Sequence, residues 1–150
     1  EDDFEKQKTI FESMLSLAEK YHKPVSIHSR KTIDEIYDVL TSFNLNGVLL
    51  HWFDGSKKQL SVAMDKDYFV SYGPVMVYAN DKQVLLKYTR KEKILVETDG
   101  PVRFSKCFGL KPAQISFIPS VVFCASKLLK ISYTEMSKLL EKNSENYLGI

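Results

Sequence analysis

Apolar residues recur through the first part of the chain at spacings of three and four, which is the period of one helix face. The residues concerned are Phe4, Phe11, Met14, Leu15, Ala18 and Tyr21. Pro24 cannot continue a helix, and residues 24–29 follow it as a short run of strand-forming residues. The opening pattern therefore predicts a helix and then a strand.

The alternation of helix and strand continues along the chain. Apolar runs predict three further strands, at residues 47–53, 68–73 and 93–99. Between them lie stretches of helical period, each preceded by Thr32, Ser56 or Asn80, which are residue types that cap helices. Residues 100–116 show no period and predict a long loop, after which Pro119 and Ser132 introduce two last helices.

Short strands that alternate with helices form βαβ units, in which the strands are parallel. The spacing of these units suits a (β/α) barrel or a doubly wound sheet. Only four strands are predicted, and a complete eight-stranded barrel needs about 200 residues or more. We therefore expect one α/β domain over residues 1–150, with four parallel strands.

Composition narrows the choice of function only slightly. The chain has 150 residues, 44% of them hydrophobic, and its net charge of +2 does not by itself indicate nucleic acid or a membrane. No apolar run approaches the roughly 18 residues of a membrane span, and the charged first residues do not resemble a signal peptide. Cys107 and Cys124 form no ligand motif and suit reduced thiols. We expect a cytoplasmic protein without a membrane partner.

Three polar residues stand at the carboxyl ends of predicted strands, where parallel α/β folds place their sites. They are His28, His51 and Asp99. Imidazole and carboxylate groups are usual ligands of catalytic divalent ions, and a carboxylate such as Asp99 can also accept a proton from water. The pattern predicts part of a metal-dependent hydrolase site; the alternative is that each is an ordinary polar residue at a strand end.

Four neighbours of these residues are weaker candidates. Glu97 shares a strand face with Asp99 and could orient a ligand or act as half of a carboxylate pair. Arg30 and Arg103 follow strand ends, where arginine can bind phosphate or remain a solvated charge. Trp52 could stack on a base or be a packing aromatic.

Several strings in this order resemble one known family. They are Val25-Ser-Ile-His28-Ser-Arg30, His51-Trp-Phe-Asp-Gly55-Ser56 and Leu95-Val-Glu97-Thr-Asp99-Gly-Pro101, with Asn143 and Asn146-Tyr-Leu near the end. Together they are similar to the TatD family of metal-dependent deoxyribonucleases, in the amidohydrolase superfamily. The resemblance covers nearly the whole chain.

The resemblance implies a TIM-type (β/α)8 barrel that hydrolyses phosphodiester bonds in DNA with one or two divalent ions, such as Zn, Mg or Mn. It implies that His28 and His51 are metal ligands after the fifth and sixth strands. It also implies that Asp99 is a ligand and proton acceptor after the eighth strand. DNA is the expected substrate.

The sequence departs from the family in one large respect. It contains no His-x-His pair, and counterparts of the first four strands are not visible. We therefore expect the C-terminal half of the barrel, comprising strands five to eight and the closing helices. The N-terminal half would have to come from the rest of a longer protein or from another chain. Two other interpretations stay open: a related amidohydrolase acting on a small metabolite, and a catalytically inactive fragment or association module.

Overall fold

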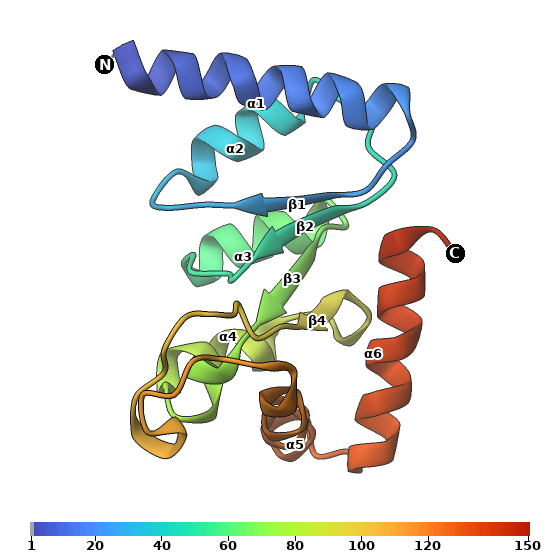
Figure 1. Ribbon diagram of the computed structural model, residues 1–150. Helices are drawn as coiled ribbons and strands as arrows, with labels where there is room; N and C mark the ends of the chain where they lie inside the picture. Colours follow the sequence, from blue (N-terminus) through green and yellow to red (C-terminus); the bar gives the residue numbers. More distant parts are fainter. Residues whose placement is uncertain (1) are drawn as a thin grey trace.

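Four short strands alternate with helices in the computed structural model, which describes residues 2–150 (Figure 1). The strands are β1 (Val25–His28), β2 (Val48–His51), β3 (Phe69–Tyr72) and β4 (Ile94–Val96). The helices are α1 (Asp2–Lys20), α2 (Ile33–Leu40), α3 (Lys57–Asp65), α4 (Asn80–Tyr88), α5 (Ile118–Leu129) and α6 (Tyr133–Leu148). Each predicted strand is confirmed, although each is shorter than its apolar run.

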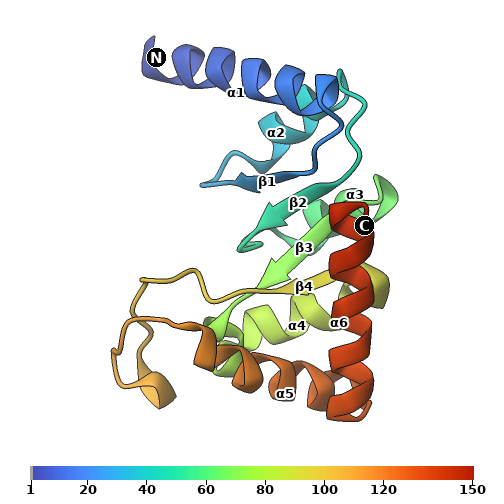
Figure 2. The ribbon, with the colours of Figure 1, turned by 45° about the vertical axis from the view of Figure 1, so that its right-hand side comes forward.

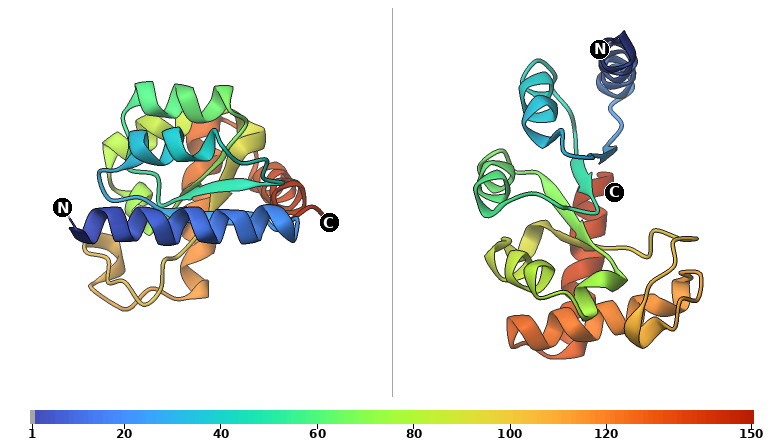
Figure 3. Two further views of the ribbon diagram at one scale, coloured as in Figure 1. Left: turned by 90° about the horizontal axis from the view of Figure 1, so that it is seen from above. Right: turned by 90° about the vertical axis from the view of Figure 1, so that its left-hand side faces the viewer.

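The strands form one parallel sheet in the order β1-β2-β3-β4. Helices α2, α3 and α4 all lie on the same side of this sheet (Figure 3, right). A doubly wound sheet would place helices on both faces and would reverse its strand order, whereas a barrel keeps sequential order and one helical face. The structure thus decides between the two folds, and the sheet is part of a TIM-type barrel.

The main core lies between the sheet and the helices that cover it. Alternate strand residues point into this core, among them Ile27, Leu50, Val70 and Ile94, all of which are buried. The intervening residues point to the other face of the sheet, as the period of two requires. On that face Ser26 and His28 are exposed.

Two of the four expected helix caps are confirmed and two are wrong. Asn80 is the first residue of α4 and not its cap, and no side chain caps that helix. Ser56 and Ser132 each accept a hydrogen bond from the backbone N–H three residues later and form complete capping boxes. Thr32 precedes α2 but makes no cap hydrogen bond through its side chain. Its ψ of 26° lies outside the extended region that aims a capping oxygen at the free N–H groups.

Helix α6 stands beside the amino-terminal ends of the strands (Figures 1 and 2). Buried Asn143 attaches it to the sheet, because its Nδ2 donates to the carbonyl oxygens of Lys91 and Ile94 at 2.8 Å each. At the end of the helix, Tyr147 packs edge-on against Phe69. Its carbonyl oxygen would lie 2.6 Å from a Cβ at Gly47, so β2 needs a glycine there.

The segment after β4 is more ordered than the predicted loop. It contains two 3-10 turns, Lys106–Phe108 and Ile115–Phe117. Within residues 2–150 no single helix is long and apolar enough to span a membrane; only the bent pair Ile115–Leu129 and Tyr133–Leu148, taken together, meets the criteria of length and composition.

Candidate metal centre

The three principal candidate residues meet at the carboxyl ends of the strands. His28 and His51 are register partners at the ends of β1 and β2, and their ring centroids lie 5.8 Å apart. Asp99 follows β4, and its Oδ1 lies 3.3 Å from His51 Nε2. Parallel pairing in register therefore brings together residues that are 23 and 48 positions apart in sequence.

A second carboxylate orients the His51 ring from its other nitrogen. Nδ1 of His51 lies 2.6 Å from Oε2 of Glu97. Because a carboxylate only accepts hydrogen bonds, Nδ1 carries the hydrogen and donates it. The other ring nitrogen, Nε2, faces Asp99. This is the arrangement by which proteins fix the tautomer of a metal-binding histidine, and it agrees with the orienting role considered for Glu97.

Ser71 is a member of the site that sequence reasoning missed. It is buried on β3, donates to Glu97 Oε2 at 2.6 Å and accepts from the backbone N–H of Trp52 at 3.1 Å. It thus connects Glu97 to the backbone that directly follows His51. The only signal in the sequence was its place in the strand, two residues after Phe69 and therefore on the same face, opposite the helices.

The backbone at this edge adopts an unusual conformation in two places. Trp52 and Asp99 have φ angles of 48° and 51°, in the left-handed region that most side chains avoid. Each such residue costs on the order of 1–3 kcal/mol unless the surroundings hold it, and such residues gather at functional sites. Here Ser71 and the N–H of Trp52 supply one restraint.

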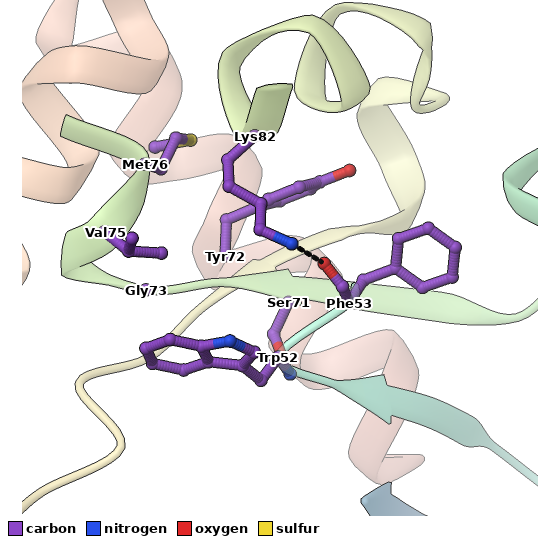
Figure 4. Close-up of a pocket in the computed structure, with 8 residues that line it drawn as sticks. All are labelled: Trp52, Phe53, Ser71, Tyr72, Gly73, Val75, Met76 and Lys82. Carbon is purple, nitrogen blue, oxygen red and sulfur yellow. Dashed lines mark hydrogen bonds between the residues drawn. The ribbon is translucent and has the colours of Figure 1, made fainter. Parts of the chain in front are cut away.

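A small, mostly apolar cavity of about 10 Å³ lies beside Trp52, between β3 and α4 (Figure 4). The Lys82 side chain reaches from α4 toward it, donates to the carbonyl oxygen of Phe53 at 3.2 Å and pairs with Asp54. Lys82 is buried, and it anchors the loop that follows β2. That loop begins directly after His51 and Trp52, so the anchor limits how far the site can move.

The donor set suits a divalent ion on two observations. Nε2 of His51 and Oδ1 of Asp99 face each other 3.3 Å apart, so both atoms could contact one ion placed between them. Ligands at about 2.1 Å in tetrahedral geometry would be about 3.4 Å apart, close to this separation. In addition, Glu97 Oε1 is buried, and none of residues 2–150 donates a hydrogen bond to it.

The set is nevertheless partial within this chain. Among residues 2–150, no three His, Cys, Asp or Glu side chains are gathered closely enough to form a metal-binding group. His51 and Asp99 form the pair that could hold an ion, and exposed His28 stands beside them. Further ligands would have to approach from the uncovered side of the sheet.

The weaker candidates occupy different surroundings. Trp52 stacks on Phe104, with ring centroids 5.4 Å apart and planes at 16°, so it packs against the segment after β4. Arg103 is exposed and donates from Nη1 to the carbonyl oxygen of Leu110. Arg30 is exposed and, with His28, lines a groove between α1 and α2. A role for any of them toward substrate stays a prediction.

A parallel barrel-type sheet with histidine and aspartate at its carboxyl edge is an arrangement found in metal-dependent α/β enzymes. The family model described as TatD related DNase matches residues 1–149. The chain therefore belongs to the TatD family, as its strings of residues suggested.

Individual relatives agree with this assignment. The chain is 23% identical to the uncharacterized metal-dependent hydrolase YabD of Bacillus subtilis, over 96% of this chain and 58% of that protein. It is 26% identical to the 3'-5' ssDNA/RNA exonuclease TatD of Salmonella typhimurium, over 73% and 44% of the two chains. The crystal structure of YjjV, a TatD homolog from Escherichia coli, superposes with a TM-score of 0.90 at 24% identity, over 99% and 58%. The matched regions thus span about half the length of these proteins, between 44% and 58%.

Proposed function

We propose that this chain contributes one side of the active site of a divalent-metal-dependent hydrolase that cleaves phosphodiester bonds in DNA. The observation that carries the proposal is the arrangement Glu97–His51–Asp99, in which one carboxylate orients the imidazole and the other faces its free nitrogen at 3.3 Å. Support for the substrate comes from family membership and from the similarity to the Salmonella 3'-5' ssDNA/RNA exonuclease.

The residues have separate roles in this proposal. His51 and Asp99 hold the ion, with His28 as a third ligand. When bound, a divalent ion supplies hydroxide near neutral pH and polarises the phosphoryl group. Asp99 accepts the proton of the attacking water, and Glu97 accepts from Nδ1 of His51 and so orients the ring with Nε2 toward the ion. The remaining ligands come from the other half of the barrel, in the same protein or in another chain.

The test uses the natural full-length protein and a single-stranded DNA oligonucleotide as substrate. Asp99→Ala should lower metal-dependent turnover at least about 100-fold, because it removes both a ligand and the proton acceptor. Bound metal, measured by mass spectrometry of the elements, should fall in parallel. Asp65→Ala is the matched control. Asp65 is exposed at the end of α3, near the amino-terminal ends of the strands and away from the carboxyl ends where the site lies.

Three results would overturn the proposal. Unchanged turnover of the Asp99→Ala protein would exclude Asp99 from the site. Hydrolysis of ester or amide substrates without hydrolysis of DNA would favour the related amidohydrolase. A full-length protein that takes up metal but hydrolyses none of these substrates would indicate an inactive association module.

A further inference from the structure

Residues 100–117, which we call the post-β4 lobe, form a small structure with a core of their own. Phe104, Phe108 and Ala113 are buried together in it. The Ala113 N–H donates to the carbonyl oxygen of Val102, and the Leu110 N–H to that of Phe104, each at 2.8 Å. Because these contacts close the lobe on itself, the backbone that carries its surface side chains has a defined conformation.

The lobe adjoins the candidate metal centre. It begins directly after Asp99, and its Phe104 ring stacks on Trp52, the neighbour of His51. Figure 3 (right) shows it, in orange, on the side of the strands opposite α2, α3 and α4. A molecule that reaches the strand ends from the uncovered face therefore meets this lobe.

The charge of the lobe is entirely positive. It contains Arg103, Lys106 and Lys111 and no Asp or Glu, and all three basic side chains are exposed. Its three charges exceed the net charge of the whole chain, +2, which is otherwise balanced. Lys106 Nζ lies 5.0 Å from the centre of the Tyr78 ring, and Arg103 donates to a backbone carbonyl, but none of the ion pairs found within residues 2–150 involves the three residues. Their positive charges are therefore not neutralised by a carboxylate of the described chain.

We infer that the post-β4 lobe binds the phosphate backbone of a nucleic-acid strand and holds it across the metal centre. The inference rests on the proposed function, which it deepens by assigning the binding of the polymer beyond the bond that is cut. Basic side chains on a segment that contains no acidic residue attract a chain of phosphates, and each phosphate contact releases a counterion. An anionic membrane surface could also bind these charges. It is too large to contact His51 and Asp99 at the same time, whereas a single nucleic-acid strand can.

The experiment measures the binding of a twelve-residue single-stranded oligonucleotide to the full-length protein at several salt concentrations, with EDTA to prevent turnover. The triple substitution Arg103→Gln, Lys106→Gln and Lys111→Gln should lower the slope of log affinity against log salt by about 2, or about 0.7 per contact. At 0.1 M salt this corresponds to about a 100-fold loss of affinity. A dinucleotide, which is too short to cross the lobe, should lose much less.

Two controls separate charge at this position from charge in general and from unfolding. Lys66→Gln, Lys138→Gln and Lys142→Gln remove the same charge from exposed positions near the opposite end of the sheet and should leave the slope unchanged. The double substitution Lys106→Gln and Lys111→Gln keeps the Arg103 contact with Leu110 and should lower the slope by about 1.4.

A small phosphodiester, bis(p-nitrophenyl) phosphate, keeps this inference distinct from the proposed function, because its hydrolysis tests the metal centre alone. An unchanged slope in the triple variant overturns the role of the lobe, even where the small diester is hydrolysed. Equal losses in the lobe and control variants overturn it as well. Binding to anionic vesicles that depends on the lobe, without oligonucleotide binding, would assign the surface to a membrane instead.

Discussion

Replacement of Asn143 tests how the last helix is attached to the sheet. Nδ2 of Asn143 donates to two carbonyl oxygens, those of Lys91 and Ile94, and the side chain is only 1% exposed. Asn143→Ala leaves both carbonyls without that donor in a buried place. Each buried carbonyl left without a donor costs about 1–3 kcal/mol. The substitution also removes Oδ1, a buried acceptor with no donor within residues 2–150, which offsets part of this cost. The free energy of unfolding should therefore fall by about 3 kcal/mol.

The free energy of unfolding of the full-length protein in urea measures this loss, and calorimetry should show a fall in Tm of about 6–12 °C. Asn143→Asp keeps the size of the side chain but cannot donate, so it should destabilise at least as much as alanine. Asn146→Ala, exposed on the same helix, is the control and should change stability by less than about 0.5 kcal/mol. A loss below about 1 kcal/mol for Asn143→Ala would refute the reasoning, because it would mean that water reaches the two carbonyls.

Two further predictions concern electrostatics. Glu97→Ala should weaken divalent-metal binding about 10–100-fold by calorimetric titration, whereas Glu97→Gln should cost less because its amide oxygen can still accept from His51 and Ser71; equal affinity in all three proteins would contradict the orienting role. Burial would raise the pKa of Asp67, but its hydrogen bonds and attraction to Lys93 and Arg90 outweigh this and hold the pKa below its usual value. Its stabilising effect is therefore present above the unfolded pKa of about 3.9 and is lost as pH falls through the lower folded pKa. Asp67→Asn should flatten the acid limb of the stability–pH curve, and an unchanged limb would contradict this assignment.

The alternation of helices and strands was predictable because it rests on burial, which leaves a strong period in the sequence. The units bury one face of each helix and nearly all of β2 and β3, so residues 47–53 and 68–73 read as apolar runs. The strand ends were less well placed. Trp52 and Phe53 extend the apolar run of β2, but the positive φ of Trp52 turns the chain out of the sheet immediately after His51.

The position of the candidate site was also predictable, but its connections were not. His28, His51 and Asp99 could be placed from the rule that sites lie at the carboxyl ends of parallel strands. Ser71 was missed because a serine inside a strand has no period of its own and becomes informative only once its partners are known. The order within the post-β4 lobe was missed for a similar reason, since its core of Phe104 and Phe108 forms by tertiary packing and leaves no regular spacing.

The hydrogen bonds from Ser71 and His51 to Glu97 join three neighbouring strands, and they explain why the sheet itself sets the geometry of the site. Glu97, just after β4, accepts from His51 at the end of β2 and from Ser71 on β3. A slip of one residue in any of these strands would turn its polar side chain to the helical face and break the connection. The contact between His51 and Glu97 is therefore fixed by strand register, and Asp99 follows two residues after Glu97. A metal bound there would find its first ligands already in place, with the rest supplied across the uncovered face of the sheet.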